Sequence, residues 1–247
     1  MEQEISKQHV QLPNNMGETN LTPKDQLIYL SIRRFMNSKS KIAYPSLAKI
    51  SEVSGACIST VRSSIARLEE KDYFKVVKKG KAQEYHFNEL KAFEPFSYDF
   101  LDNSDLTFTE KSYIAATQQY MYKDVEGIGK VSYTNKELAE KINMTESTIS
   151  RTNNSLIRKN YLTIVKNEAR DIESGCKTDT KIFNLNKLGQ AIIWVLQNHE
   201  ERREQNTEDI LKLKIDNQDM KRQLEEQKKL IDKLLKEREK EHTKYTI

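Results

Sequence analysis

The chain has 247 residues, of which 36% are hydrophobic and 32% charged, and its formal net charge is +4. This length accommodates two domains of about 80–100 residues plus a further segment, and the high charged fraction suits small helical domains with a solvated helix. Two cysteines cannot form a disulfide framework, and no apolar run approaches the roughly 18–20 residues of a membrane span. We therefore expect a soluble, cytoplasmic protein without a leader, a metal site or a cofactor.

The N-terminal residues 1–20 are polar and show no hydrophobic period, so they are interpreted as a flexible arm. A helix is predicted to begin directly after them at Thr22-Pro-Lys-Asp25, because Thr, Pro and an acid at these positions favour a helix start. This helix should run to about Asn37 and bury an apolar face.

A helix-turn-helix pattern follows at residues 50–78. A short apolar helix runs into Ser54-Gly55, a pair suited to a tight turn. The second helix has apolar residues on one face at Val61, Ile65 and Leu68. Residues 73–87 then alternate like two strands around a lysine-rich turn. Helix, turn, helix and hairpin in this order predict a winged helix-turn-helix domain over residues 21–92.

The polar face of the second predicted helix and the hairpin tip supply candidate DNA contacts. Hydroxyl and guanidinium groups on a helix in the major groove can reach base edges and phosphates, and cations at a hairpin tip can reach a flanking backbone. The candidates are Ser59, Thr60, Arg62, Ser63, Arg67, Lys78, Lys79 and Lys81. Residues 20–92 carry 14 Lys/Arg against 7 Asp/Glu, which favours a polyanion. A merely solvated helix face is the alternative interpretation.

The same stretch recurs 88 positions later. Residues 138–166 align with 50–78 without a gap and share eight of 29 residues. Because two matches to one pattern rarely arise by chance, residues 106–200 are interpreted as a second winged-helix domain. Its DNA-binding candidates are Thr145, Ser147, Thr148, Ser150, Arg151, Asn154, Arg158 and Lys166. Asn153 stands where the first copy has Ile65, so this helix is expected to roll slightly or to expose an amide.

The second copy is less basic than the first. Residues 106–186 carry 12 Lys/Arg against 10 Asp/Glu. DNA contact is still expected there, and a role in dimerisation or partner binding stays open.

Between the two domains, residues 93–105 contain four aromatic and four acidic residues. A disordered linker would lack these aromatics. This linker is therefore expected to pack on one or both domains and to fix their relative placement.

The C-terminal residues 201–247 predict a long coiled-coil helix. Three- and four-residue spacings define a seam of Ile210, Leu213, Asn217, Met220, Leu224, Gln227, Ile231 and Leu234. An Asn at a core position favours a parallel two-stranded coil. We expect a homodimer through this seam, and a single exposed helix that binds another protein is the alternative.

The segment from Pro45 to Tyr73 reads P-S-L-A-x-I-x3-S-G-x3-S-T-V-x6-L-x4-Y. It resembles the winged helix-turn-helix superfamily, in the form found in phage, plasmid and mobile-element proteins of bacteria. The resemblance implies a mainly α fold with small β-hairpin wings, a bacterial or phage origin, and binding of double-stranded DNA. Two such domains in tandem also resemble plasmid replication initiators, and winged-helix proteins with a coiled coil include bacterial DNA-anchoring and segregation factors.

These features together predict a non-enzymatic, sequence-specific double-stranded DNA-binding protein, namely a transcriptional regulator. The four histidines are scattered, and neither a nucleophile–base pair nor a phosphate-binding glycine loop occurs, so no catalytic residue is expected. Two other functions stay open: a plasmid or phage replication initiator or replisome organiser, and a structural DNA-anchoring or virion-associated protein whose coil binds a partner.

Overall fold

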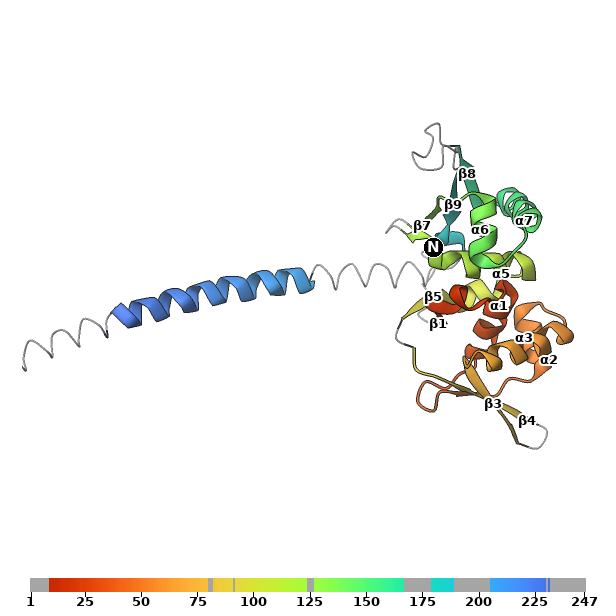
Figure 1. Cartoon of the computed structure of the whole chain (residues 1–247), viewed down its shortest axis with the longest axis horizontal. Helices are drawn as coiled ribbons and strands as arrows, with labels where there is room; N and C mark the ends of the chain where they lie inside the picture. The colour runs from red at the N-terminus through yellow and green to blue at the C-terminus, as the bar shows by residue number, and fades with distance from the viewer. Residues whose placement is uncertain are drawn as a thin grey trace, which may run out of the picture. The chain divides into compact units, whose positions relative to one another are not determined.

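A computed structural model describes residues 9–79, 82–90, 92–123, 127–166, 179–188, 205–229 and 231. The chain divides into two compact units, Met1–Gln197 and Asn198–Ile247. The first unit is mainly helical with three small sheets (Figure 1). Its two repeated portions are called here the first half (residues 21–92) and the second half (residues 106–188).

The first half contains a helix, a short strand, a helix pair and a hairpin. Its elements are α1 (Pro23–Arg33), β2 (Ile42–Ala43), α2 (Leu47–Ser54), α3 (Ile58–Glu70), β3 (Phe74–Lys79) and β4 (Ala82–Phe87). Thr22 and Asp25 form the predicted capping box at the start of α1. Gly55 ends α2 with a left-handed φ of 77°, a conformation that glycine adopts without a steric penalty. The three strands form a sheet in the order β2-β4-β3.

The second half follows the same plan. Its elements are α5 (Phe108–Thr117), the 3-10 helix η2 (Gln118–Tyr120), β6 (Tyr122–Lys123), β7 (Ile128–Val131), α6 (Asn135–Ile142), α7 (Glu146–Arg158), β8 (Leu162–Val165), β9 (Thr180–Asn184) and α8 (Leu185–Leu188). A sheet with the order β6-β7-β9-β8 closes this half. Residues 189–204 lie outside the described residues.

The offset of 88 residues seen in the sequence holds for the helix pairs. Helices α6 and α7 have the lengths of α2 and α3 and begin 88 residues later. Asn143 takes the left-handed position of Gly55, because Asn tolerates that conformation better than most residues. The mainly α class with small β wings that the sequence predicted is confirmed.

The N-terminal segment is not the flexible arm that its polar composition suggested. Residues 9–19 form β1 (His9–Pro13) and the 3-10 helix η1 (Asn14–Thr19). The side chains of Val10, Leu12 and Met16 are buried in the core of the first unit. Apolar side chains within a polar segment therefore decide its structure. Residues 1–8 lie outside the described part.

The linker, residues 93–105, is ordered as well. It forms β5 (Phe93–Ser97), which pairs antiparallel with β1, and the short helix α4 (Tyr98–Asp102). Phe96, Phe100 and Leu101 are buried, and the rings of Phe96 and Phe100 lie 5.2 Å apart. Phe96 and Phe100 thus pack in the core, as the aromatic residues of this segment led us to expect, whereas Phe93 is exposed.

Helices α1 and α5 lie at the centre of the unit and pack against each other. Every residue from 25 to 33 in α1 and from 110 to 117 in α5 is buried. A helix that is buried on all sides must have packing partners around its full circumference. Each of the two helices therefore supports its own helix pair on one side and the other half of the unit on another.

In the second unit, residues 205–229 are helical and all their side chains are exposed. The described seam residues Ile210, Leu213, Asn217, Met220, Leu224, Gln227 and Ile231 are all exposed, whereas Leu234 lies outside the described residues. Within the described part of the chain, no helix is both long and apolar enough to cross a membrane.

Candidate nucleic-acid interface

Helix α3 has one buried and one polar face. Val61, Ser64, Ile65 and Leu68 are buried on the inner face. On the outer face Ser59, Arg62 and Ser63 are exposed and Thr60 is half-buried. The four candidates at the N-terminal end of α3 are therefore available to a ligand, with three hydroxyls and one guanidinium group as donors.

The first turn of α3 carries an exposed thiol that the candidate list missed. Cys57 is the N-cap residue, and its Sγ lies 3.1 Å from Ser59 Oγ and 3.1 Å from Thr60 Oγ1. Hydrogen bonds from these two hydroxyls lower the pKa of Cys57 to about 7. A negative charge on this sulfur would lie among the groups expected to approach phosphate.

Arg67 does not lie free on the polar face, although the sequence suggested it as a DNA contact. Its Nε and Nη2 donate to both oxygens of Asp25, with the shortest distance 2.7 Å. Asp25 is fully buried, while the Arg67 side chain is 42% exposed. Burial alone would raise the pKa of Asp25, but hydrogen bonds from Arg67, Ser64 and Thr22 outweigh burial and hold that pKa below its usual value. Arg67 thus ties α3 to the start of α1.

The hairpin β3–β4 brings further cations beside α3. Lys78 is exposed and opposite Gln83 in the register. Lys81 lies outside the described residues, as does the side chain of Lys79. Lys75, exposed on the same strand, was not among the candidates. Strand alternation could have identified it, because residues 75 and 77 lie on the exposed face opposite buried Phe74.

Helix α7 presents the corresponding face in the second half. Thr145, Ser147, Ser150, Arg151, Asn154 and Arg158 are exposed, Thr148 is half-buried, and Lys166 is exposed beyond β8. Thr145 caps the helix by accepting from the Thr148 backbone N–H. Arg151 and Arg158 each donate Nε to a carbonyl of the preceding helical turn, at 3.2 and 3.3 Å. Their exposed guanidinium groups lie along the helix surface.

Asn153 was expected to roll the helix or expose an amide, and the exposed amide is not found. Its side chain is buried, and its Oδ1 accepts a 2.8 Å hydrogen bond from the hydroxyl of Tyr113 on α5. Its Nδ2 lies 3.4 Å from Asn135 Oδ1. Asn153 therefore finds its hydrogen-bond partners inside the protein.

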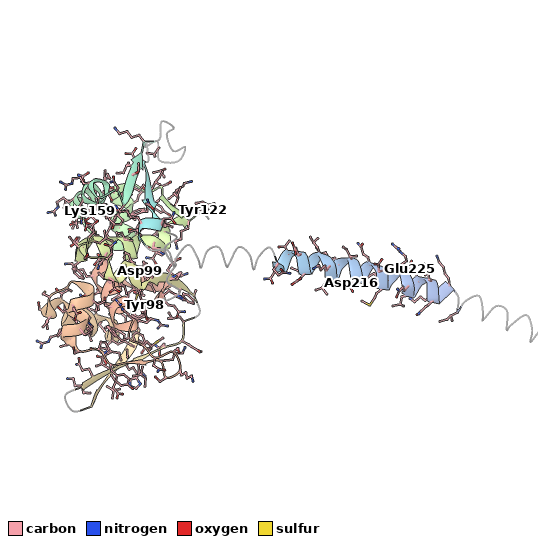
Figure 2. The ribbon with its side chains drawn as sticks, turned by 180° about the vertical axis from the view of Figure 1, so that it is seen from behind. Tyr98, Asp99, Tyr122, Lys159, Asp216 and Glu225 are labelled. Atoms are coloured by element: carbon pink, nitrogen blue, oxygen red, sulfur yellow. The ribbon has the colours of Figure 1, made fainter. Side chains whose placement is uncertain are left out.

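Several lysines of the second half serve internal structure. Their ammonium groups donate to backbone carbonyls or buried carboxylates: Lys111 to Leu101, Lys123 to Glu94, Lys159 to Asp105 and Glu110, Lys181 to Tyr133, and Lys187 to Lys159. Burial lowers the pKa of Lys111, Lys123 and Lys181. Lys159 lies beside α7 in Figure 2. The formal charge of this half therefore overstates what it offers to phosphate.

An exposed aromatic at the start of α2 was also missed by sequence reasoning. Tyr44 is 58% exposed and precedes Ser46, whose Oγ accepts from the Lys49 backbone N–H as the N-cap of α2. A phenol beside a helix N-terminus can donate to a phosphate oxygen.

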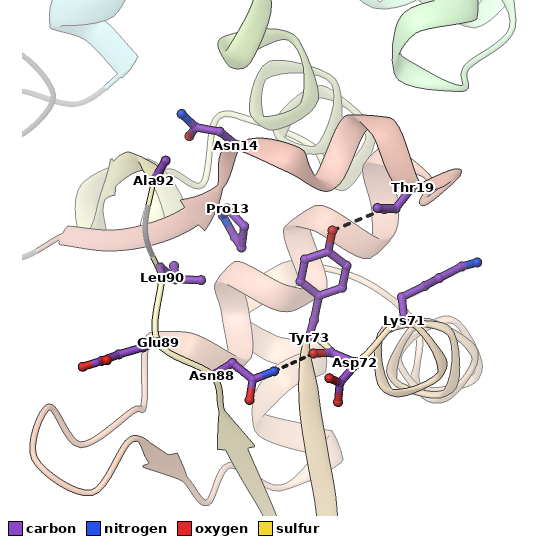
Figure 3. Close-up of a pocket in the computed structure, with 10 residues that line it drawn as sticks. All are labelled: Pro13, Asn14, Thr19, Lys71, Asp72, Tyr73, Asn88, Glu89, Leu90 and Ala92. Carbon is purple, nitrogen blue, oxygen red and sulfur yellow. Dashed lines mark hydrogen bonds between the residues drawn. The ribbon is translucent and has the colours of Figure 1, made fainter.

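A cavity of about 530 Å³ lies at the opposite end of α3 from its first turn (Figure 3). Its walls come from η1, from the residues after α3, and from the segment after β4. Two hydrogen bonds join these walls: Thr19 Oγ1 with Tyr73 Oη at 3.3 Å, and Asn88 Nδ2 to the Asp72 carbonyl at 2.7 Å. The cavity is therefore separate from the candidate DNA contacts of α3.

In Figure 1 the pair α6–α7 lies above α5 and the pair α2–α3 lies below α1, so α1 and α5 stand between the two helix pairs. The hairpins β3–β4 and β8–β9 extend toward opposite ends.

Residues 19–73 match the family model of a helix-turn-helix domain. The matched segment runs from the end of η1 through α1, α2 and α3 to the start of the hairpin. No curated protein matches the chain significantly. The helix-turn-helix domain supports DNA binding, and its second helix is the one that carries the exposed polar face.

Proposed function

We propose that this chain is a sequence-specific, non-enzymatic regulator of transcription that binds double-stranded DNA in the cytoplasm of a bacterial cell, encoded by the bacterium or a phage. The observation that carries the proposal is the helix-turn-helix match together with the exposed hydroxyl and guanidinium face of α3. Such a face suits the major groove, where base edges present donors and acceptors.

In the first half, Ser59 and Thr60 would position a phosphate at the N-terminus of α3, where backbone N–H groups also point outward. Arg62 and Ser63, one turn further on, would read base edges. Lys78, with Lys79 and Lys81, would hold the flanking backbone. Arg67 has a different role, because Asp25 already engages its guanidinium group.

In the second half, α7 would act in the same way, so that the protein has two tandem winged helix-turn-helix domains. Ser147 and Thr148 repeat Ser59 and Thr60 at the same helical positions. Arg151 is exposed one turn later. The first turns would therefore make equivalent phosphate contacts, while the residues that follow would read different bases.

The C-terminal helix would form a parallel homodimer. Its support is the exposed apolar seam, in which Asn217 occupies a core position that specifies two strands at some cost in stability. Deleting residues 208–247 should lower the mass measured by light scattering to that of a monomer. An unchanged mass would exclude this helix as the dimer contact.

The main experiment is selection of bound sequences from a random duplex pool at stated salt, followed by titration of Arg62→Ala and Arg151→Ala. Loss of a base-reading arginine should cost about 1–3 kcal/mol and relax specificity at one position. The matched control is Lys71→Ala, which removes an exposed cation just beyond the far end of α3 and should change affinity little.

A uniform loss across all sequences, with a shallower salt dependence, would reassign Arg62 to phosphate. Affinity for duplex no greater than for heparin would overturn the proposal. The polar faces would then have to serve protein contacts.

A replication initiator is the second candidate, favoured by the presence of both helix pairs in one compact unit. Such a protein should bind repeated sites near an origin and recruit a helicase or its loader. Origin-like repeats beside the gene would support this function, whereas a divergent promoter would support regulation.

A further inference from the structure

We propose that residues 9–20, called here the strap, determine the spacing of the DNA segments that the protein accepts, because they hold the α2–α3 and α6–α7 pairs in one fixed arrangement. The inference rests on the proposed function and takes α3 and α7 of one chain to contact the same duplex. Within it, the strap acts through position alone and touches no DNA.

The strap is fixed to the first half through a strand pair and a buried apolar face. All five residues of β1 pair with β5, from His9 opposite Ser97 to Pro13 opposite Phe93. Leu12 is only 2% exposed and packs in the core with Val10 and Met16. The guanidinium of Arg33 on α1 donates to Gln11 Oε1 at 2.9 Å. These contacts leave β1 little freedom relative to α1.

The same strap reaches the second half through η1. Gly17 lies so close to η2 that an added Cβ would overlap the Gln119 amide and the Tyr120 hydroxyl. The Asn20 carbonyl accepts a 3.3 Å hydrogen bond from Nδ2 of Asn143, the residue that ends α6. The strap precedes the first half in the sequence, and it therefore contacts the second half as well.

The partner strand β5 is held from the second half as well. Glu94 forms an ion pair with Lys123 on β6, and the Pro95 carbonyl lies 3.4 Å from Gln118 Nε2. The β1–β5 ribbon thus has contacts on both sides of the α1–α5 junction. Two packed helices alone can slide or tilt by small amounts relative to each other. Contacts outside the interface between α1 and α5 oppose such motion.

DNA geometry makes this rigidity a source of specificity. One base pair more or less between two contacted segments moves the second by about 3.4 Å along the axis and rotates it by about 34°, since a turn holds about 10–10.5 base pairs. A rigid pair of helices cannot follow both changes. A pair joined only through α1 and α5 could follow them in part.

The test compares strap variants on duplexes in which the two selected segments are separated by the preferred spacing or by one or two base pairs more or fewer. Leu12→Asp places a carboxylate in the core and should release β1. Gly17→Leu should displace η1 from η2 while leaving the β1–β5 pairing. Asn14→Asp is the matched control, because it adds the same charge at an exposed position of the strap.

Wild type and Asn14→Asp should lose 10-fold or more in affinity for each base pair of altered spacing. Leu12→Asp and Gly17→Leu should bind the preferred duplex more weakly and lose less than 3-fold on altered spacings. Circular dichroism should show retained helix, and hydrogen exchange should show faster exchange of residues 9–13 in Leu12→Asp. If Leu12→Asp does not fold, Gly17→Leu carries the comparison.

Unchanged spacing preference in a folded variant whose strap exchanges rapidly would overturn the role of the strap and leave the proposed function standing. A wild-type footprint that covers one segment only, with no effect of Arg151→Ala, would overturn the two-segment binding mode and with it this inference. If Leu12→Asp or Gly17→Leu loses the spacing preference but keeps the two-segment footprint, the result supports both the role of the strap and the two-segment binding mode.

Discussion

The two halves of the first unit satisfy the same structural requirement with different residues. Asp25 and Glu110 occupy equivalent capping-box positions in α1 and α5, and both are buried. Asp25 receives the bidentate guanidinium of Arg67, whereas Glu110 receives the single ammonium of Lys159 at 2.8 Å. In both halves, therefore, a carboxylate near the start of the first helix (α1 or α5) binds a cation at the C-terminal part of the second helix of the pair (α3 or α7). The cation occupies a different sequence position in each half.

A second difference lies in the core, at buried residues of α1 and α3 in the first half and of α5 and α7 in the second half. Ile28 and Ile65 are buried in the first half, and Tyr113 and Asn153 stand at the equivalent positions of the second half. The two polar replacements bond to each other at 2.8 Å. A buried amide is tolerated because its partner changed with it, and neither replacement alone would be.

The largest expected effect comes from removing the two carboxylates. Asp25→Ala should destabilise the protein by about 3 kcal/mol, because Arg67 loses a two-bond partner and α1 loses its capping box. Glu110→Ala should cost about 2 kcal/mol, since α5 also loses its capping box but only one ammonium contact is lost. Urea unfolding followed by circular dichroism measures both values. Equal losses would show that bidentate geometry adds nothing to the tie.

The polar core pair allows a double-mutant cycle. Tyr113→Phe should cost about 2 kcal/mol, because it leaves the Asn153 carbonyl oxygen buried without its donor. Asn153→Leu should cost a similar amount by stranding the Tyr113 hydroxyl. The double variant removes both polar groups and should be more stable than the sum of the single losses indicates. Strict additivity in urea unfolding would mean that the two groups do not depend on each other.

The sequence predicted the helix-turn-helix of the first half because its signals are local: caps, a Gly turn and a three-to-four-residue apolar period. The partners of Arg67 and Asn153 are 42 and 40 residues away in the chain, so no local pattern could reveal them. The strap was misread since polar residues outnumber its few buried apolar ones. Alternation of Val10 and Leu12 was the available signal for a strand, and it is too short to stand out.

Acid should weaken both carboxylate ties. Folding lowers the pKa of Asp25 and of Glu110 from ordinary values of 3.8 and 4.5, since hydrogen bonds from their partners outweigh burial. The unfolded chain therefore takes up protons first as the pH falls, and stability is lost below about pH 4.5. Asp25→Asn with Glu110→Gln should be less stable at pH 7 but should show a flatter profile between pH 5 and 3. If the stability of the double variant falls with pH in parallel with that of the wild type, other groups cause the acid sensitivity.

The smallest expected effect concerns the N-caps of α3 and α7. The Thr145 hydroxyl caps α7 by accepting from a backbone N–H, whereas the side chain of Cys57 makes no such cap bond to α3. Cys57→Thr should therefore stabilise the first half by about 0.5–1 kcal/mol. The reverse change, Thr145→Cys, is the matched control and should cost a similar amount.

Cys57→Thr also separates the effect of Cys57 on stability from its effect on DNA binding. The pKa of about 7 predicts that iodoacetamide modifies Cys57 increasingly between pH 6 and 8 in folded protein, and only near pH 9 once urea has unfolded it. Alkylation should weaken DNA binding if α3 enters a groove, because the adduct projects from its first turn. Cys57→Thr should keep full affinity after the same treatment. If alkylated wild type binds as well as the untreated protein, the first turn of α3 does not approach DNA, although the cap and its stability would be unaffected.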